Sequence, residues 1–175
     1  MNTFFELLKN RRSIRKFTAQ AVEPEKIEFL LKAALMAPSS KRGMPWHFVV
    51  VTEAELLQKL SEARKYGTQF LAAAPLAIVV LADTSKTDVW VEDATVAATY
   101  IQLAAQSIGL GSCWAQARTR EHAEGLSVEA YIRNLLNIPK NFAVENMIGI
   151  GYQDERKKPH DEAALAFDKV SYNSF

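Results

Sequence analysis

The chain has 175 residues, and its 21 Lys and Arg residues are almost balanced by 20 Asp and Glu, which leaves a formal net charge of +1. This balance argues against sequence-independent binding of nucleic acid, which depends on many Lys and Arg contacts to phosphates. With 49% hydrophobic and 23% charged residues, the composition is that of an ordinary globular protein, and we expect a single domain over residues 1–175.

The apolar runs and the cysteine content bear on the location of the protein. The longest apolar run, Phe70 to Ala82, is interrupted by Pro75 and has 13 residues, whereas a membrane-spanning helix needs about 20. We therefore expect no transmembrane segment and no membrane partner. The first residues enter an amphipathic pattern without a basic and then apolar leader, which predicts no secretory signal. The single cysteine, Cys113, cannot form an internal disulfide and favours a cytoplasmic location.

Taken in chain order, the hydrophobic patterns predict helices that alternate with short strands. The predicted helices cover 24–36, 53–64, 94–108 and 128–136, and the predicted strands cover 47–51, 76–81 and 142–150. The strand over 76–81 is apolar on both alternating faces, as in a central strand, and the helix over 94–108 is apolar nearly all round. Thr52 and Glu55 have the spacing of a capping box before the second helix, and the residues beyond Pro159 are polar and extended. These elements favour a layered α+β domain.

Residues 9–16, which we call the basic segment, hold five cations and no acid within eight residues of an almost neutral chain. Arg offers paired donors that suit a phosphate, and the hydroxyl of Ser13 adds a donor for a phosphate or a ring carbonyl. The segment therefore predicts a site for a localised anion. A solvated basic turn, or a localisation-like run, is the alternative that these residues leave open.

Residues 37–48 combine two prolines, two hydroxyls, a cationic pair, a glycine and a tryptophan. Proline stiffening and Gly43 predict a fixed loop after the helix over 24–36. Such a loop would present the donors of Ser39, Ser40 and Arg42, while Trp46 anchors its far end in the core. A rigid helix-to-strand turn with Trp46 as a plain core residue explains the same pattern.

Four stretches together resemble the FMN-dependent nitroreductase family in its compact form, and the resemblance covers most of the chain. They are residues 11–17, residues 37–48, residues 103–114 with the run Gly109-Leu110-Gly111-Ser112-Cys113-Trp114, and residues 148–152 with the run Ile148-Gly149-Ile150-Gly151-Tyr152. The resemblance implies an α+β fold with a central, mostly antiparallel sheet flanked by helices. It also implies an obligate homodimer with an FMN in each of two clefts at the subunit interface.

By the same resemblance, residues of both chains would bind each FMN. One chain would hold the phosphate and the pyrimidine edge through Arg11, Arg12, Ser13 and Arg15, and the other would contribute Pro38, Ser39, Ser40 and Arg42. The flavin ring would be lined by Gly111, Ser112, Cys113 and Trp114. The family usually places a phosphate-binding cation after the glycine-tyrosine turn, which here is one of Arg156, Lys157 and Lys158, although a solvated charge run explains these three as well.

Several residues depart from the common pattern of the family. Arg42 stands where many relatives have an Asn that faces the flavin, Met44 where many have Gln, and Thr99-Tyr100 where Gln-Asn is common. Substrate preference is therefore not implied by the resemblance, and Arg42 is open to a role with either cofactor or acceptor. Gln153 replaces a frequent proline, which leaves the path of the C-terminal residues open.

The residues of other cofactor sites are missing from the sequence. No G-x-G-x-x-G follows a strand and no G-x-x-x-x-G-K-[ST] occurs, so neither a Rossmann site nor a P-loop is supported. His47, His122 and His160 are scattered without metal-ligand spacing, and we expect no metal. Cys113 follows a buried helix and two glycines, where a thiol packs more often than it reacts.

The patterns and the resemblance predict a flavin-dependent oxidoreductase that transfers a hydride from NADH or NADPH through FMN to a small electron-poor acceptor, such as a nitroaromatic or a quinone. The flavin would carry the electron transfer, so no catalytic side chain is predicted, and Arg15 is expected to stabilise negative charge on the reduced ring. Trp114 and the residues from Arg42 to Met44 would border the acceptor. The alternatives are an ene-reductase, a dehalogenase or a flavin-destroying enzyme on the same scaffold, or a non-catalytic protein that binds FMN or nucleic acid.

Overall fold

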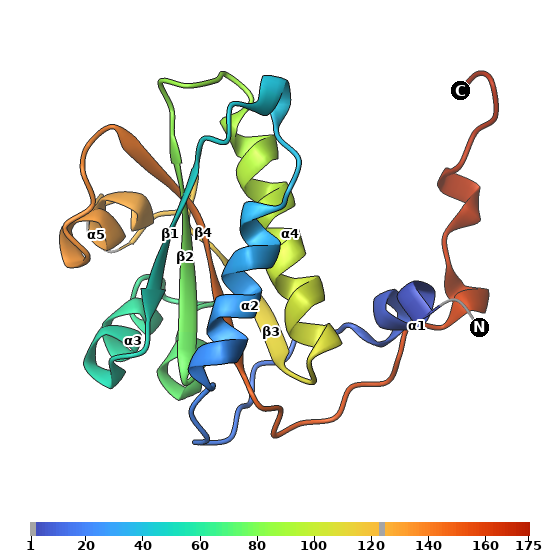
Figure 1. Ribbon diagram of the computed structural model, residues 1–175, viewed down its shortest axis with the longest axis horizontal. Helices are drawn as coiled ribbons and strands as arrows, with labels where there is room; N and C mark the ends of the chain where they lie inside the picture. Colours follow the sequence, from blue (N-terminus) through green and yellow to red (C-terminus); the bar gives the residue numbers. More distant parts are fainter. Residues whose placement is uncertain (1–2, 123–124) are drawn as a thin grey trace.

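Four antiparallel strands form the sheet on which the chain is built, in the order β1–β2–β4–β3. In the computed structural model, which describes residues 3–122 and 125–175, the strands are β1 (Trp46–Val51), β2 (Leu76–Asp83), β3 (Gly111–Gln116) and β4 (Phe142–Gly151) (Figure 1). The interior position of β2 and β4 explains why both faces of these strands are apolar. The expected α+β fold with a mostly antiparallel sheet is confirmed.

Helices cover both faces of the sheet. On one face lie α2 (Pro24–Leu35) and α4 (Trp90–Ser107), and on the other lie α3 (Ala54–Ser61) and α5 (Val128–Leu135) (Figure 1). Successive residues of β2 alternate between the two layers. Ile78 packs with the cluster beneath α2 and α4, whereas Val79 packs with the cluster beneath α3 and α5. The predicted central strand is thus confirmed, and each face of it belongs to a separate apolar layer.

The helix boundaries agree with the sequence patterns within one residue at most ends, but α3 ends at Ser61 rather than at residue 64 and α4 begins before residue 94. The helix predicted from residue 53 begins at Ala54, and the preceding Glu53 makes no side-chain capping hydrogen bond, so the predicted capping box is wrong. The cap forms instead at α5, where the hydroxyl of Ser127 accepts the Ala130 N–H at 3.1 Å.

Helix α4 begins at Trp90, one turn before the predicted start, and runs for 18 residues. At a rise of ~1.5 Å per residue its length is about 27 Å. Alanines such as Ala94, Ala98 and Ala105 are buried against the sheet, which allows close packing. The opposite side of α4 carries Tyr100, of which 39% is exposed, so burial nearly all round does not hold within one chain.

Strand β3 and helix α1 were absent from the predicted elements, and the residues beyond Pro159 were predicted as extended. Helix α1 (Thr3–Asn10) lies away from the sheet, and the residues beyond Pro159 run to it and then past it (Figure 1). His160 N–H donates to the carbonyl of Lys9 at 2.9 Å, and Lys9 pairs with Glu162 at 2.7 Å. The C-terminal residues are exposed and include two short 3-10 turns, Glu162–Ala164 and Phe167–Lys169. None of the described helices combines the length and the apolar character needed to cross a membrane.

Candidate functional site

The basic segment is fixed against the start of β3 by its apolar residues. Ile14 and the following Phe17 are 2% and 7% exposed, and Ile14 N–H donates to the Ser112 carbonyl at 3.0 Å. Ser13 forms a parallel bridge with Ser112. The buried anchors leave the side chains between and before them at the surface, where Arg11, Arg12 and Ser13 are half-buried and Arg15 is exposed.

The residues that follow β4 run along the other side of the same segment. Thr18 N–H donates to the Tyr152 carbonyl and Asp154 N–H to the Lys16 carbonyl, both at 2.9 Å. The carboxylate of Glu155 accepts the backbone N–H of Arg15 at 2.6 Å. Three stretches that were predicted separately, residues 11–16, 111–114 and 152–158, therefore meet in one place, which we call the basic cluster.

The cations of the basic cluster differ in how far they are engaged. Lys157 Nζ lies 2.7 Å from the Glu155 carboxylate and is the main cause that lowers the pKa of that carboxyl to about 2. Arg12 donates to the carbonyl of Lys158. The guanidinium groups of Arg11 and Arg15 make no hydrogen bond or ion pair with any other residue of the described ranges. These two side chains are available to an external anion.

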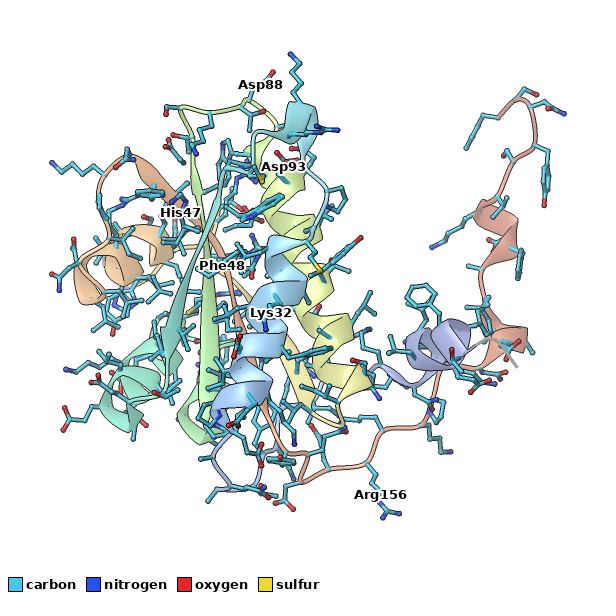
Figure 2. The ribbon with its side chains drawn as sticks, viewed as in Figure 1. Lys32, His47, Phe48, Asp88, Asp93 and Arg156 are labelled. Carbon is cyan, nitrogen blue, oxygen red and sulfur yellow. The ribbon has the colours of Figure 1, made fainter. Side chains whose placement is uncertain are left out.

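Arg156 lies at the outer edge of the basic cluster. Figure 2 shows its side chain directed away from the sheet. It too has no hydrogen bond or ion pair within the described part of the chain. Of the three cations that follow Tyr152, Lys157 is paired with Glu155, whereas the charged groups of Arg156 and Lys158 have no partner among the described residues, because Arg12 contacts only the backbone carbonyl of Lys158.

Strand β3 begins with Gly111, and the close packing of the basic segment requires a glycine at this position. A Cβ built on Gly111 would lie 2.9 Å from the Cβ of Ile14 and 2.7 Å from Cγ of Gln153, so only glycine lets the basic segment approach this closely. Ser112 is 3% exposed. Trp114 is half-buried against the cluster beneath α4, and its Nε1–H donates to Gln116 Oε1 at 2.8 Å.

Cys113 does not face the surface that the resemblance assigns to it. Its side chain is 1% exposed and packs with the cluster beneath α3 and α5, and burial raises the pKa of its thiol. Only the backbone of Cys113 can line a ligand. The raised pKa and the burial also oppose a role as a nucleophile, as the sequence predicted.

The residues Ser39 to Met44, which we call the Ser39–Met44 loop, form a tightly held turn after α2. Ser39 Oγ accepts the Met44 N–H at 3.1 Å, and Asp93 Oδ1 of α4 accepts the Ser40 N–H at 2.9 Å. Trp46, 5% exposed, packs with Ala37 and Ala97, so the predicted anchoring of the loop in the core is confirmed. Pro38 is exposed beside the loop.

One chain does not bring the Ser39–Met44 loop to the basic cluster. The loop is bonded to the first turn of α4, whereas Gly111 follows the last turn, and α4 is about 27 Å long. Figure 2 shows Asp93, beside the loop, near the top of the view and Arg156, in the basic cluster, near the bottom. The two halves of the predicted FMN site are therefore separated within the chain.

Buried polar residues near the far end of β3 were not assigned any role from the sequence. The side chain of Glu145 is 5% exposed, and burial raises the pKa of its carboxyl. It is the extra residue of a β-bulge, because Val80 faces Asn146 while Leu81 faces Val144. Gln116 Nε2 lies 3.3 Å from Glu145 Oε1, and the Asn146 amide has no partner among the described residues.

Comparison with known proteins agrees with this architecture. The model of the nitroreductase family matches residues 8–66 and 58–152. An FMN-dependent nitroreductase from Clostridium difficile R20291 has 50% sequence identity and a TM-score of 0.96, over 98% of this chain and 99% of that chain. A protein of Archaeoglobus fulgidus named "Putative NADH dehydrogenase/NAD(P)H nitroreductase" is 40% identical over 161 residues, which are 90% of this chain and 89% of the relative.

A more distant branch is represented by an iodotyrosine deiodinase from Thermotoga neapolitana, which is 24% identical over 204 residues and is matched along its full length. The family match covers well over half of the chain, and the sheet, its helices and the basic cluster agree with the stretches on which the resemblance rests. The chain belongs to the nitroreductase family.

Proposed function

We propose that the protein is an FMN-dependent oxidoreductase that takes a hydride from NADH or NADPH and delivers it to a small electron-poor acceptor, such as a nitroaromatic or a quinone. The observation that carries this proposal is the basic cluster, in which the guanidinium groups of Arg11 and Arg15 have no partner among the described residues although the whole chain is almost neutral. The names of the relatives from C. difficile and A. fulgidus support FMN as cofactor and NAD(P)H as donor.

The residues of the basic cluster fit the two polar ends of FMN. Arg11 and Arg12, with Ser13 and the unengaged Arg156, supply donors for the phosphate and the ribityl chain. Arg15 would place its positive charge at the pyrimidine edge, where charge develops on reduction. Bound FMN supplies the electron transfer, so the protein has to bind, orient and shield it rather than provide a nucleophile.

A second copy of the chain completes this proposed site. Because α4 separates the Ser39–Met44 loop from the basic cluster, we assign Pro38, Ser39 and Ser40 to the FMN that is held by the basic cluster of the partner subunit. The accessible surface of one chain is 10501 Å², against about 8,600 Å² expected for a compact monomer of its mass. The excess and the exposed apolar side chains favour a homodimer. We also infer a cytoplasmic location, which a chain with a single cysteine does not contradict.

Purified protein provides a direct test. We expect it to be yellow, to bleach on anaerobic addition of NADH or NADPH, and to regain its colour when a nitroaromatic or a quinone is added. Reductive dehalogenation is the second candidate, which the deiodinase relative favours. It is tested by adding iodotyrosine to the reduced protein in place of the nitroaromatic or quinone. A protein that neither retains FMN nor is reduced by either nucleotide would contradict the proposal.

The assignment of the basic segment predicts that Arg11→Ala weakens FMN binding by roughly ten- to a hundred-fold, since one charge-assisted contact contributes about 1.5–3 kcal/mol. Equilibrium dialysis followed by flavin absorbance measures the change. Arg120→Ala is a matched control, because Arg120 is exposed and follows Gln116, at the end of β3 opposite to Gly111 and the basic cluster. Stoichiometric FMN in the Arg11 variant after extensive dialysis would remove Arg11 from the site.

A further inference from the structure

The Ser39–Met44 loop has a backbone conformation that residues other than glycine rarely adopt. Lys41, Arg42 and Met44 have φ values of +49°, +58° and +41°, in the left-handed region. Three such residues within four positions cost free energy and persist only where the surroundings impose the conformation. A loop held in this way presents its side chains in a defined direction.

Asp93 imposes this conformation from α4. Asp93 is buried, with 6% of the residue exposed, and its Oδ1 accepts the Ser40 N–H at the start of the turn. Ser39 Oγ closes the other end through the Met44 N–H. Asp93 therefore contacts the backbone of the loop. It leaves Lys41 and Arg42, the two cations at the tip of the loop, unpaired.

The tip of the loop carries two free positive charges. Lys41 and Arg42 are both exposed, and neither makes an ion pair or a side-chain hydrogen bond with another described residue. The Asp93 carboxylate lies beside the loop, but it accepts a hydrogen bond from the backbone N–H of Ser40 and makes no ion pair with either cation. The charges are thus available to a molecule that approaches the loop.

We infer that the Ser39–Met44 loop selects acceptors that carry a carboxylate or another anionic group, with Arg42 as the specificity residue and Asp93 as the positioning residue. The inference rests on the proposed function, in which this loop borders the flavin of the partner subunit. An anionic group within a few ångströms of an unpaired guanidinium gains enough attraction in a partly screened site to change acceptor preference about tenfold. Salt weakens such attraction, since the screening length is about 10 Å at 0.1 M.

A matched pair of acceptors isolates this charge effect. Para-nitrobenzoate and its methyl ester share the reacting nitro group and ring and differ in charge. For the wild type and each variant, kcat/KM is measured on both, and the ratio of anion to ester is compared with the wild-type ratio. We expect Arg42→Gln to lower this ratio about tenfold, mainly through KM for the anion. Lys140→Gln, which removes an exposed cation elsewhere, is the matched control and should leave the ratio unchanged.

Variants of Asp93 test the positioning role separately. Asp93→Ala removes the acceptor of the Ser40 N–H and should lower the ratio in the same sense as Arg42→Gln. Asp93→Asn keeps an oxygen at that place and should preserve the ratio, although it removes the negative charge. The wild-type preference should also fall as salt is added, whereas the ratio of the Arg42→Gln variant, which retains only Lys41 at the tip, should fall less. A merely structural role of Asp93 would change both acceptors together and would not alter the salt dependence.

The possible results separate this inference from the proposed function. Equal losses on both acceptors, or loss of FMN from Arg42→Gln, would overturn it and assign Arg42 to structure or cofactor. The inference would also be overturned if Arg42→Gln slowed anaerobic reduction by NADH or NADPH and left the ratio of anion to ester unchanged. The cations of the loop would then bind the phosphates of the donor. If Asp93→Ala fails to fold, the ratios of the Arg42→Gln and Asp93→Asn variants still test the inference. A wild type that NAD(P)H does not reduce would instead refute the proposed function.

Discussion

Glu155 ties the residues after β4 to the basic segment. Its carboxylate lies 2.7 Å from Lys157 Nζ and accepts the backbone N–H groups of Arg15 at 2.6 Å and Lys16 at 3.2 Å. The ion pair with Lys157 first, and then the hydrogen bond from Arg15, lower the pKa of Glu155 to about 2. A single acidic side chain thus sets the backbone from which Arg15 projects.

The lowered pKa of Glu155 predicts a pH dependence of stability. In the unfolded chain a Glu has a pKa of about 4.3, so the contribution of Glu155 is fully present above that value and is lost as the pH falls from there towards about 2. Thermal unfolding of the wild type and Glu155→Gln should therefore differ most at neutral pH and converge over this window. Glu53→Gln, at a position with no capping hydrogen bond, is the control. A stability difference that does not change with pH would contradict this role of the Glu155 carboxylate.

At the scale of elements, the close approach of the basic segment to β3 depends on Gly111. We expect Gly111→Ala to destabilise the protein by about 1–3 kcal/mol, because the added Cβ would overlap Ile14 and Gln153. Its FMN affinity should fall as well, since the basic segment is displaced. Denaturant unfolding and flavin titration under folding conditions measure the two effects.

Gly149→Ala separates the two consequences. Its Cβ would lie 2.7 Å from Phe70, in the core beneath α3 and not at the basic segment. This variant should lose stability to a similar extent while the folded fraction keeps its FMN affinity. If Gly111→Ala loses stability but binds FMN as tightly as Gly149→Ala does, the packing of the basic segment on β3 is not what orders the site.

The elements that the sequence predicted are those whose pattern is set by burial alone. Strand β2 is apolar on both faces because both of its neighbours are strands and both of its faces carry helices. Strand β3 was missed because its first residues, Gly111 to Cys113, are small and lack β-branched side chains. Its pairing with β4 is a tertiary contact, which no local pattern records.

The site residues also divide into those that a local pattern predicts and those that depend on a tertiary contact. The basic segment was predicted because its charge density is a local property of the chain. Glu155 was not, because it bonds to Arg15 across 140 positions, and Asp93 was not, because it meets Ser40 across 53. The available signal for Asp93 was an acid within an alanine-rich helix, where a buried carboxylate needs a hydrogen-bonding partner.

At the scale of the whole molecule, the single chain leaves too much apolar surface uncovered. Phe167 is 69% exposed, Tyr172 83% and Val170 52%, all in the C-terminal residues that run past α1 (Figure 1). Tyr100 on α4 and Met36 after α2 are exposed as well. Large exposed apolar side chains of this number are typical of surfaces that bind a partner, and obligate dimers bury more than about 2,000 Å².

A site shared between two copies predicts complementation between two defective chains. Arg11→Glu should abolish FMN binding by the basic cluster, and Ser40→Glu should abolish the contribution of the Ser39–Met44 loop, since each places a negative charge beside an anionic cofactor. When the two variants are unfolded together and refolded, half of the dimers pair unlike chains, and one of the two sites in each such dimer is intact. FMN binding should return to about a quarter of the wild-type stoichiometry, with sedimentation as a dimer.

The separately refolded variants are the control for this experiment, and neither should retain flavin. If all the FMN contacts lay within one chain, every chain in the mixture would still be defective and mixing would restore nothing. A folded, FMN-bound monomer at low concentration would lead to the same conclusion. Recovery on mixing would instead require that the loop and the basic cluster meet across the interface, because α4, about 27 Å long, separates them within a chain.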